Sequence, residues 1–139
     1  MRLFGRTRPP KVYVDAKILN MHDPSLTRRA YAGYVVEGRG LQNVKEVNAT
    51  ESDDAEVMAI LFAIDELKGS MGRFTVVCDH ESVVSEANRD VVKNPSEFLL
   101  RLRKTLQENR SIKLEALMSN PAHRVLTEYV NRVSSEPQA

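Results

Sequence analysis

The sequence predicts an α/β domain built on a mixed five-stranded sheet, and three observations lead to this prediction. Residues 11–47 contain three strand-like segments separated by turn residues, as in an antiparallel meander. Residues 50–67 then follow a helical period. Residues 73–79 form a nearly uninterrupted apolar run, which is typical of a strand covered on both faces. Because this run follows a helix, we expect it to lie parallel to the first strand.

The first strand is expected at residues 11–19, which are rich in β-branched and aromatic side chains and include Asp15. The polar residues 20–25 predict a turn or loop. A second strand is expected at 30–37 and a third at 41–47, joined by a tight turn over residues 38–40.

The central helix is expected over residues 50–67. Thr50 and Asp53 have the spacing of a capping box, and acids crowd the first turn. Steps of three and four from Glu56 reach only small and aliphatic residues: Ala59, Ile60, Ala63 and Leu67. Because burying an unpaired carboxylate is costly, Glu56 must lie at the rim, be protonated, or meet a cation such as a metal.

The second half of the chain predicts three more helices and one strand. A short helix is expected at 81–88, a longer one from Asn94 to Arg110, and a half-buried strand at 112–117. Asn120 and Pro121 are the expected cap and first position of the last helix. We therefore divide the chain into a basic arm (1–10), a single domain (11–133) and a frayed tail (134–139). For the arm, we favour a solvated terminus over a phosphate contact.

Composition excludes several classes of protein. The 139 residues are 42% apolar and 28% charged, which suits one globular domain, and the net charge of +1 leaves only local patches for a nucleic acid. The lone Cys78 excludes an internal disulfide or a cysteine-rich zinc site and favours a reducing compartment. With neither a membrane span nor a signal peptide in the sequence, we expect a cytoplasmic protein. An α/β protein that binds a small molecule is a further alternative, but no phosphate-binding Gly-rich motif supports it, and we expect no small-molecule cofactor. Nothing indicates an oligomeric state.

Three acids fall at informative places: Asp15 in the first strand, Glu56 near the start of the first helix, and Asp79 where the fourth strand ends. Together with residues 12–14, 52–63, 76–83 and 120–124 around them, they resemble the ribonuclease H family over positions 11–133. The resemblance implies a sheet with helices on both faces. It also implies an enzyme in which three or four acids hold two magnesium ions and cut the RNA strand of an RNA–DNA hybrid.

The resemblance assigns a role to each of these acids. Asp15 would bridge both ions, and Glu56 and Asp79 would each favour one. His123 stands where the family has a fourth acid, as in plant-type members with an Ala-His pair, and is the candidate fourth ligand; an imidazole suits manganese better than magnesium. The implied function is therefore a metal-dependent endoribonuclease with a nucleic-acid partner. Without metal, the carboxylates should repel one another and raise at least one pKa.

Departures from the family pattern support an alternative. No Gly-rich loop follows Asp15, and Ser52 and Asp53 stand where asparagine-type contacts to the RNA ribose are common. The alternative is a catalytically weak or inactive nucleic-acid-binding or scaffold module. The intact trio of acids argues against it, because converging carboxylates destabilise a fold that has no metal.

Each candidate also has a structural explanation. Asp15 and Asp79 could be a strand-end acid and a helix cap, and the acids at 51, 53 and 54 are expected to be a solvated helix start. His80 is more simply a cap of the next helix than a group lining the cleft, whereas ligand and structural roles stay open for His123.

Three further side chains are expected to have no direct role in the chemistry. Cys78 is expected to be a small core residue. Arg101 and Lys104 lie near the position of a basic handle in some family members, but we expect them to be on a solvated helix face.

Overall fold

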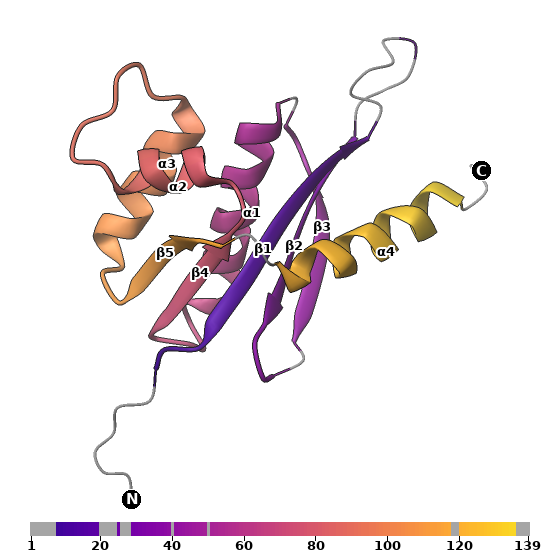
Figure 1. Ribbon diagram of the computed structural model, residues 1–139, viewed down its shortest axis with the longest axis horizontal. Helices are drawn as coiled ribbons and strands as arrows, with labels where there is room; N and C mark the ends of the chain where they lie inside the picture. The colour runs from indigo at the N-terminus through magenta and orange to yellow at the C-terminus, as the bar shows by residue number, and fades with distance from the viewer. Residues whose placement is uncertain are drawn as a thin grey trace, which may run out of the picture.

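The computed structural model describes residues 8–19, 25, 29–39, 41–49, 51–117 and 120–135, which form a five-stranded sheet with helices on both faces (Figure 1). Some sequence expectations fall outside these ranges. They are most of the arm (1–7), the loop around His22, Gly40, Thr50 of the capping box, and the end of the tail (136–139). Among the described residues, no helix has the length and apolar character needed to cross a bilayer.

The sheet has the predicted topology. Its strands are β1 (Lys11–Leu19), β2 (Arg29–Val36), β3 (Gln42–Val47), β4 (Phe74–Cys78) and β5 (Ile112–Ala116), in the order β3-β2-β1-β4-β5. The first three strands are antiparallel, and β4 is parallel to both β1 and β5. The α/β class, the antiparallel meander and the parallel fourth strand are thus confirmed.

Strands β1 and β4 separate part-way along β1, and this separation creates the space for the candidate site. They pair only from Lys11–Thr75 to Tyr13–Val77, whereas β1 stays paired with β2 as far as Leu19. Beyond Tyr13, one edge of β1 therefore has no neighbouring strand. A backbone group on this stretch bonds a side chain instead, since the Ala16 N–H donates to Glu56 of the helix over residues 52–67. The point of separation lies near the carboxyl end of β4, and ligands bind at that end of the strands in open α/β sheets.

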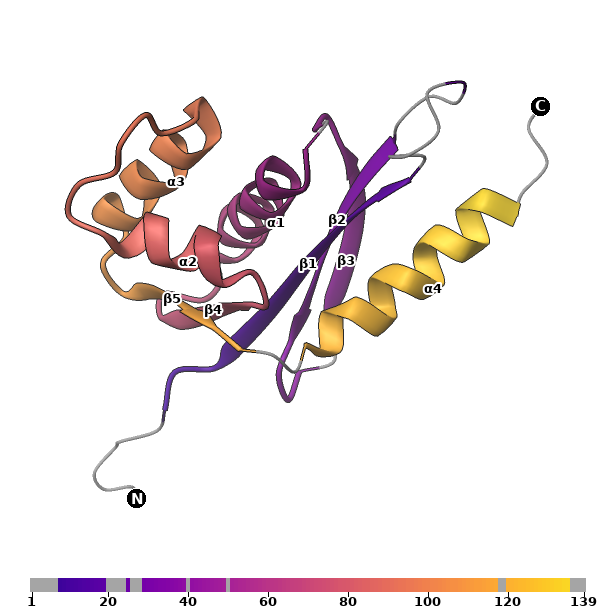
Figure 2. The ribbon, with the colours of Figure 1, turned by 45° about the horizontal axis from the view of Figure 1, so that its top comes forward.

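Four helices cover the sheet: α1 (Ser52–Leu67), α2 (Glu81–Asn88), α3 (Glu97–Glu108) and α4 (Pro121–Ser135). Helix α1 packs on one face, with α2 and α3 beside it, and α4 crosses the other face over β1 and β2 (Figure 2). A Cβ atom on Gly33 of β2 would lie 3.2 Å from Val44 Cγ2 and 3.6 Å from Leu126 Cδ1 of α4. The absence of a side chain at Gly33 therefore lets α4 approach the sheet closely.

The start of α1 differs from the capping-box prediction. The N-cap is Glu51, without a side-chain hydrogen bond to the helix, so Asp53 lies one position earlier in the helix than a capping box requires. The carboxylate of Asp53 instead pairs with His80, at 3.0 Å. A tertiary contact has replaced the local one.

Two other helix ends also differ from their predicted positions. Helix α3 begins at Glu97 rather than at 94, because Ser96 Oγ accepts a hydrogen bond from the N–H of Leu99 at 3.1 Å. Helix α4 continues to Ser135, two residues beyond the expected end of the domain.

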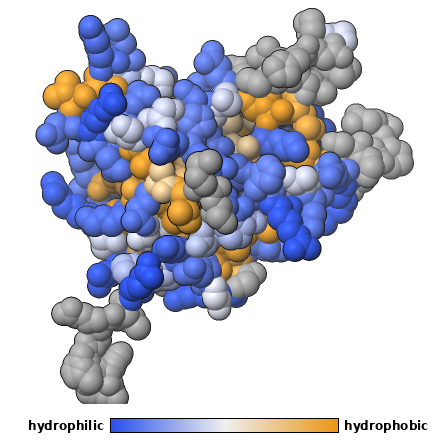
Figure 3. All heavy atoms as spheres, in the orientation of Figure 1, coloured by the Kyte–Doolittle hydropathy of each residue, from blue (hydrophilic) through white to orange (hydrophobic). Residues whose placement is uncertain are grey.

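The face shown in Figure 3 is mostly hydrophilic, with apolar side chains in separate patches.

Candidate metal centre

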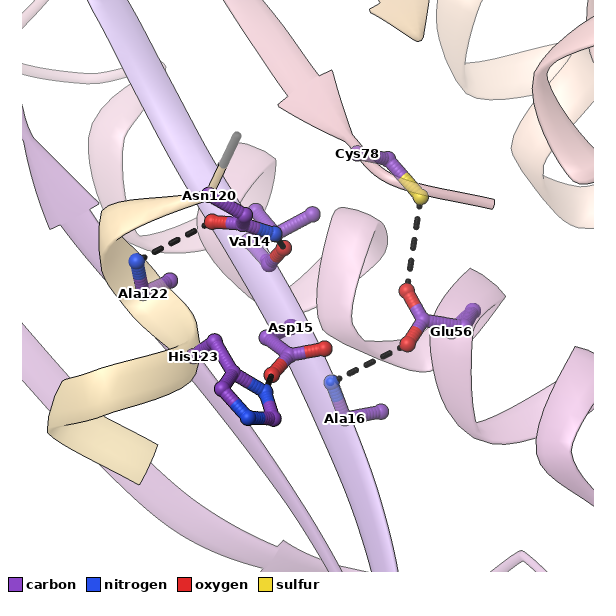
Figure 4. Close-up of polar contacts among 8 residues, drawn as sticks. All are labelled: Val14, Asp15, Ala16, Glu56, Cys78, Asn120, Ala122 and His123. Carbon is purple, nitrogen blue, oxygen red and sulfur yellow. Dashed lines mark hydrogen bonds and ion pairs between the residues drawn. The ribbon is translucent and has the colours of Figure 1, made fainter. Parts of the chain in front are cut away.

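Asp15 is a buried carboxylate in the middle of β1. It lies opposite Gly33 and is only 5% exposed, on the side of the strand that faces α4. Burial raises its pKa most, and the negative charge of Asp79 raises it further. The hydrogen bond between Asp15 Oδ2 and His123 Nδ1, at 2.9 Å, acts in the opposite direction. The ring of His123, shown in Figure 4, and the backbone of Ala16 thus both favour the charged form of Asp15, against the effect of burial.

Glu56 belongs to α1, on the opposite face of the sheet, and its side chain reaches the place where β1 and β4 separate. It is 6% exposed, and both of its carboxylate oxygens are bonded: Oε1 accepts from the N–H of Ala16 at 3.2 Å and Oε2 from the thiol of Cys78 at 3.3 Å (Figure 4). The Ala16 N–H is on the stretch of β1 that has left β4. Burial raises the pKa of Glu56 to about 8, with a further contribution from the charge of Asp15.

Asp79 follows the last residue of β4 and, unlike the other two acids, is exposed to solvent. One ligand atom from each of Glu56, Cys78 and Asp79 lies within 4.8 Å of the other two, a spacing that could hold a metal ion. Asp15 lies outside that group. Asp15 is nevertheless near enough to the other acids for their charges to interact. The charge of Asp15 raises the pKa of Glu56, and the charge of Asp79 raises the pKa of Asp15.

Helix α4 is anchored to β1 beside Asp15. Asn120 Nδ2 donates to the carbonyl of Val14 at 2.6 Å, and Asn120 Oδ1 accepts from the N–H of Ala122 at 3.0 Å. The second bond confirms the expected cap of this helix. Because Asn120 binds both the helix and the strand, it fixes where the first turn of α4 meets β1 and thereby directs the ring of His123 at Asp15. The side chain of His123 is 68% exposed, so the rest of the ring faces solvent.

His80 closes the site on the side of α2. It occupies the N-cap position of that helix, but its side chain does not cap it. The ring instead contacts Asp53 Oδ1 through Nε2 at 3.0 Å and Ser82 Oγ through Nδ1 at 3.1 Å. Its backbone N–H donates to Cys78 Sγ at 3.3 Å. The segment that carries Asp79 is therefore tied both to α1 and to the end of β4.

These groups fit a divalent cation bound by carboxylate oxygens. The groups that shift the pKa values of Asp15 and Glu56 include no lysine or arginine from the described ranges, so two buried acids lack a fixed cation. Oxygen-rich groups of this kind suit magnesium or manganese. Burial raises the pKa of the Cys78 thiol, which keeps it protonated and able to donate to Glu56. We therefore regard Cys78 as a hydrogen-bond donor to the candidate metal ligand Glu56, and not as a metal ligand itself.

Cys78 is the contributor that the sequence reasoning missed. It was expected to be a plain core residue, and it is indeed fully buried. The signal that could have revealed it is the alternation in β4: Phe74, Val76 and Cys78 all belong to the apolar cluster on the α1 face of the sheet. The side chain of Cys78 therefore had to point toward the helix that carries Glu56.

Comparisons with known proteins bear on the fold. No family model matches the sequence, and no curated protein matches it. Similar solved structures include the foamy viral protease-reverse transcriptase in complex with double-stranded DNA, with a TM-score of 0.66 and 16% identity over 89% of this chain and 90% of that one. The chain has the ribonuclease H-like fold. Another is the foamy viral protease-reverse transcriptase in complex with an RNA/DNA hybrid, with a TM-score of 0.62 and 14% identity over 91% of this chain and 20% of that one. At such identities the likeness concerns the fold alone.

Proposed function

We propose that this protein is a metal-dependent endoribonuclease that hydrolyses the RNA strand of RNA–DNA hybrids. The observation that carries the proposal is that Asp15 of β1, Glu56 of α1 and Asp79, which follows β4, lie near one another where β1 and β4 separate. Two of these acids, Asp15 and Glu56, are buried without a lysine or arginine from the described part of the chain beside them, a costly arrangement unless a bound cation compensates for it.

The carboxylates of Asp15, Glu56 and Asp79 would hold the divalent cations. Bound divalent cations supply an activated water and stabilise the charge of the leaving oxygen in phosphodiester hydrolysis. Ala16 N–H and the Cys78 thiol orient Glu56, and this matters because small displacements of a ligand reduce affinity and rate.

His123 has a role beyond the ligand position expected from the sequence. Its Nδ1 lies 2.9 Å from Asp15 Oδ2, and an Nδ1–H donates to a carboxylate oxygen, which can only accept. In this arrangement His123 orients Asp15.

The choice of an RNA–DNA hybrid rests on the sequence resemblance and on the structural neighbours. Those neighbours are complexes of the foamy viral protease-reverse transcriptase with double-stranded DNA and with an RNA/DNA hybrid. The order of the acids along the chain is also that of the ribonuclease H family.

A second candidate is a nucleic-acid-binding module with little or no turnover. One observation favours it: both oxygens of Glu56 and one oxygen of Asp15 already have protein partners, which lowers the cost of burying them without metal. In addition, the backbone after Asp15 stays paired with β2 as far as Leu19, where many family members have a Gly-rich loop.

The deciding experiment is a cleavage assay. Labelled RNA–DNA hybrid, duplex DNA, duplex RNA and single strands are incubated with the protein in magnesium or manganese. We expect cleavage of the hybrid only, reduced roughly 100-fold or more in Asp79→Asn, since even partners of metal ligands cost 10- to 100-fold. Asp65→Asn, an exposed acid at the other end of α1, is the matched control. A hybrid that is bound but never cut would favour the binding module.

A further inference from the structure

A basic cavity lies at the far edge of the sheet, away from the carboxylates. It has a volume of about 370 Å³ and is bounded by the end of α2, one side of α3 and the edge strand β5. Its charged lining comprises four cations and one acid: Arg89, Arg103, Arg110, Lys113 and Asp90. In Figure 2, these three elements lie together on the side of the sheet away from α4.

Three of the four cations are available to a ligand. The side chains of Arg89, Arg110 and Lys113 are exposed and form no hydrogen bond, ion pair or ring contact within the described ranges. Arg89 follows α2, Arg110 lies between α3 and β5, and Lys113 is in β5, so their convergence is a product of the fold. Like charges that line one cavity repel one another, and a bound anion would relieve the repulsion.

The fourth cation shapes the cavity. Arg103 donates to the carbonyls of Glu86 at 2.8 Å, Arg89 at 2.6 Å and Asp90 at 3.0 Å. These carbonyls lie at the end of α2, so the guanidinium caps that helix and holds the Arg89 segment against α3. The wall of the cavity is therefore fixed before any ligand arrives.

The charge of this cavity sets it apart from two others. The cavity between β3 and α4 has one acid and one cation, Glu128 and Arg132. The cavity at the start of α1 has four acids and no cation among its lining residues: Glu51, Asp53, Asp54 and Glu86. A polyanion would be repelled by the acidic cavity at the start of α1 and would gain little from the cavity between β3 and α4. The basic cavity is the one with the charge to attract it.

We propose that this basic cavity binds backbone phosphates of the nucleic-acid strand that the carboxylates act on. The inference rests on the proposed function, because the acidic side chains of the candidate site do not themselves attract a phosphodiester and the net charge of +1 supplies no general attraction. Lys113 pairs with Thr75, four residues before Asp79 along β4, or about 13 Å at the rise of a strand. At roughly 3.4 Å per phosphate along a duplex, the contacted phosphates lie several nucleotides from the cut.

The test measures binding without cleavage. Fluorescence anisotropy of a short labelled RNA–DNA hybrid is followed in EDTA from about 50 to 200 mM salt. The test variant is Arg110→Gln with Lys113→Gln, and Arg103 is left intact because it caps α2. The matched control is Arg39→Gln with Lys104→Gln, which removes the same charge from exposed side chains outside the cavity. Circular dichroism melting checks that both variants fold.

We expect the cavity variant to bind roughly 10- to 100-fold more weakly at 100 mM salt, with a salt slope less steep by about 1.8 for two lost phosphate contacts. The control should stay within a few-fold of wild type. Equal weakening of both variants, no change in either, or no binding by wild type would overturn the inference. So would binding of a labelled poly-glutamate peptide in place of the hybrid, since the partner would then be an acidic protein.

Failure of this inference is distinguishable from failure of the proposed function. Asp79→Asn should bind the hybrid as wild type does in EDTA, because Asp79 is not in the cavity. A protein that binds through the cavity but never cleaves would refute only the nuclease proposal. A protein that cleaves while the cavity variant binds at full strength would refute only the cavity.

Discussion

Replacing Glu56 with glutamine should stabilise the protein at alkaline pH when no metal is present. The side chain is 6% exposed, and its pKa is raised from 4.5 to about 8. Between these two values the folded state holds a proton that the unfolded chain has lost. The free energy of unfolding therefore falls as pH rises through this window, and is constant with respect to this group above and below it.

The size of the effect follows from the shift. At about 1.4 kcal/mol per pKa unit, the charged carboxylate costs the folded state roughly 4 to 5 kcal/mol above pH 8. This is an upper bound for Glu56 alone, because Asp15 titrates with it and the pair shares the shift. A domain of this size has only about 5 to 15 kcal/mol of stability in total. Glu56→Gln keeps an oxygen for the Ala16 N–H and has no charge to bury.

Urea unfolding of both proteins at intervals from pH 4.5 to 9, in EDTA, measures the difference. We expect near-equal stability at pH 4.5 and a growing advantage for the variant toward pH 9. Glu108→Gln, which changes an exposed acid at the end of α3, is the control and should show no such trend. If wild type and Glu56→Gln keep a constant difference across the range, Glu56 does not hold a proton in the folded state and the burial argument fails.

Metal provides a second arm of the same experiment. At pH 8, manganese at 100 times its dissociation constant should stabilise wild type by about 2.7 kcal/mol, because it binds only the folded state. The gain should disappear in Glu56→Gln. An equal gain in both proteins would mean that manganese binds without Glu56.

Three other predictions follow. Cys78→Val should weaken manganese binding roughly 10-fold in calorimetry, because it leaves Glu56 Oε2 without its donor. Cys78→Ser keeps a donor, and its affinity for manganese should stay near that of wild type. Equal loss of affinity in both variants would show that only packing matters. His123→Ala should raise the pKa of Asp15, measured from its carboxyl carbon by NMR, because the His123 hydrogen bond lowers that pKa; an unchanged value would contradict the contact. Gly33→Ala should cost about 1 to 3 kcal/mol in urea unfolding, because its Cβ would lie 3.2 Å from Val44, while Gly69→Ala, with open space around it, should cost nothing.

Much of the architecture was readable from the sequence because its signals are local. Hydrophobic period placed all five strands and four helices, and Asn120 was recognised as a cap from its position before a proline. The parallel pairing of β4 with β1 followed from the helix between them. The predictions that failed concerned the ends of helices. At the start of α1, Asp53 pairs with His80, which is 27 positions away in the sequence. No pattern within one helix reveals such a contact.

The sequence by itself determined which acids are candidates, because a carboxylate heading an apolar row is visible without coordinates. Only the tertiary structure decided how each is held: Glu56 by the Cys78 thiol and Ala16 N–H, Asp15 by His123. It alone also gathered Arg89, Arg110 and Lys113 around one cavity. The physical reason is range. Periodicity and capping act over a few neighbouring residues, whereas burial, pKa and charge convergence depend on groups that only the folded chain brings within a few ångströms of one another.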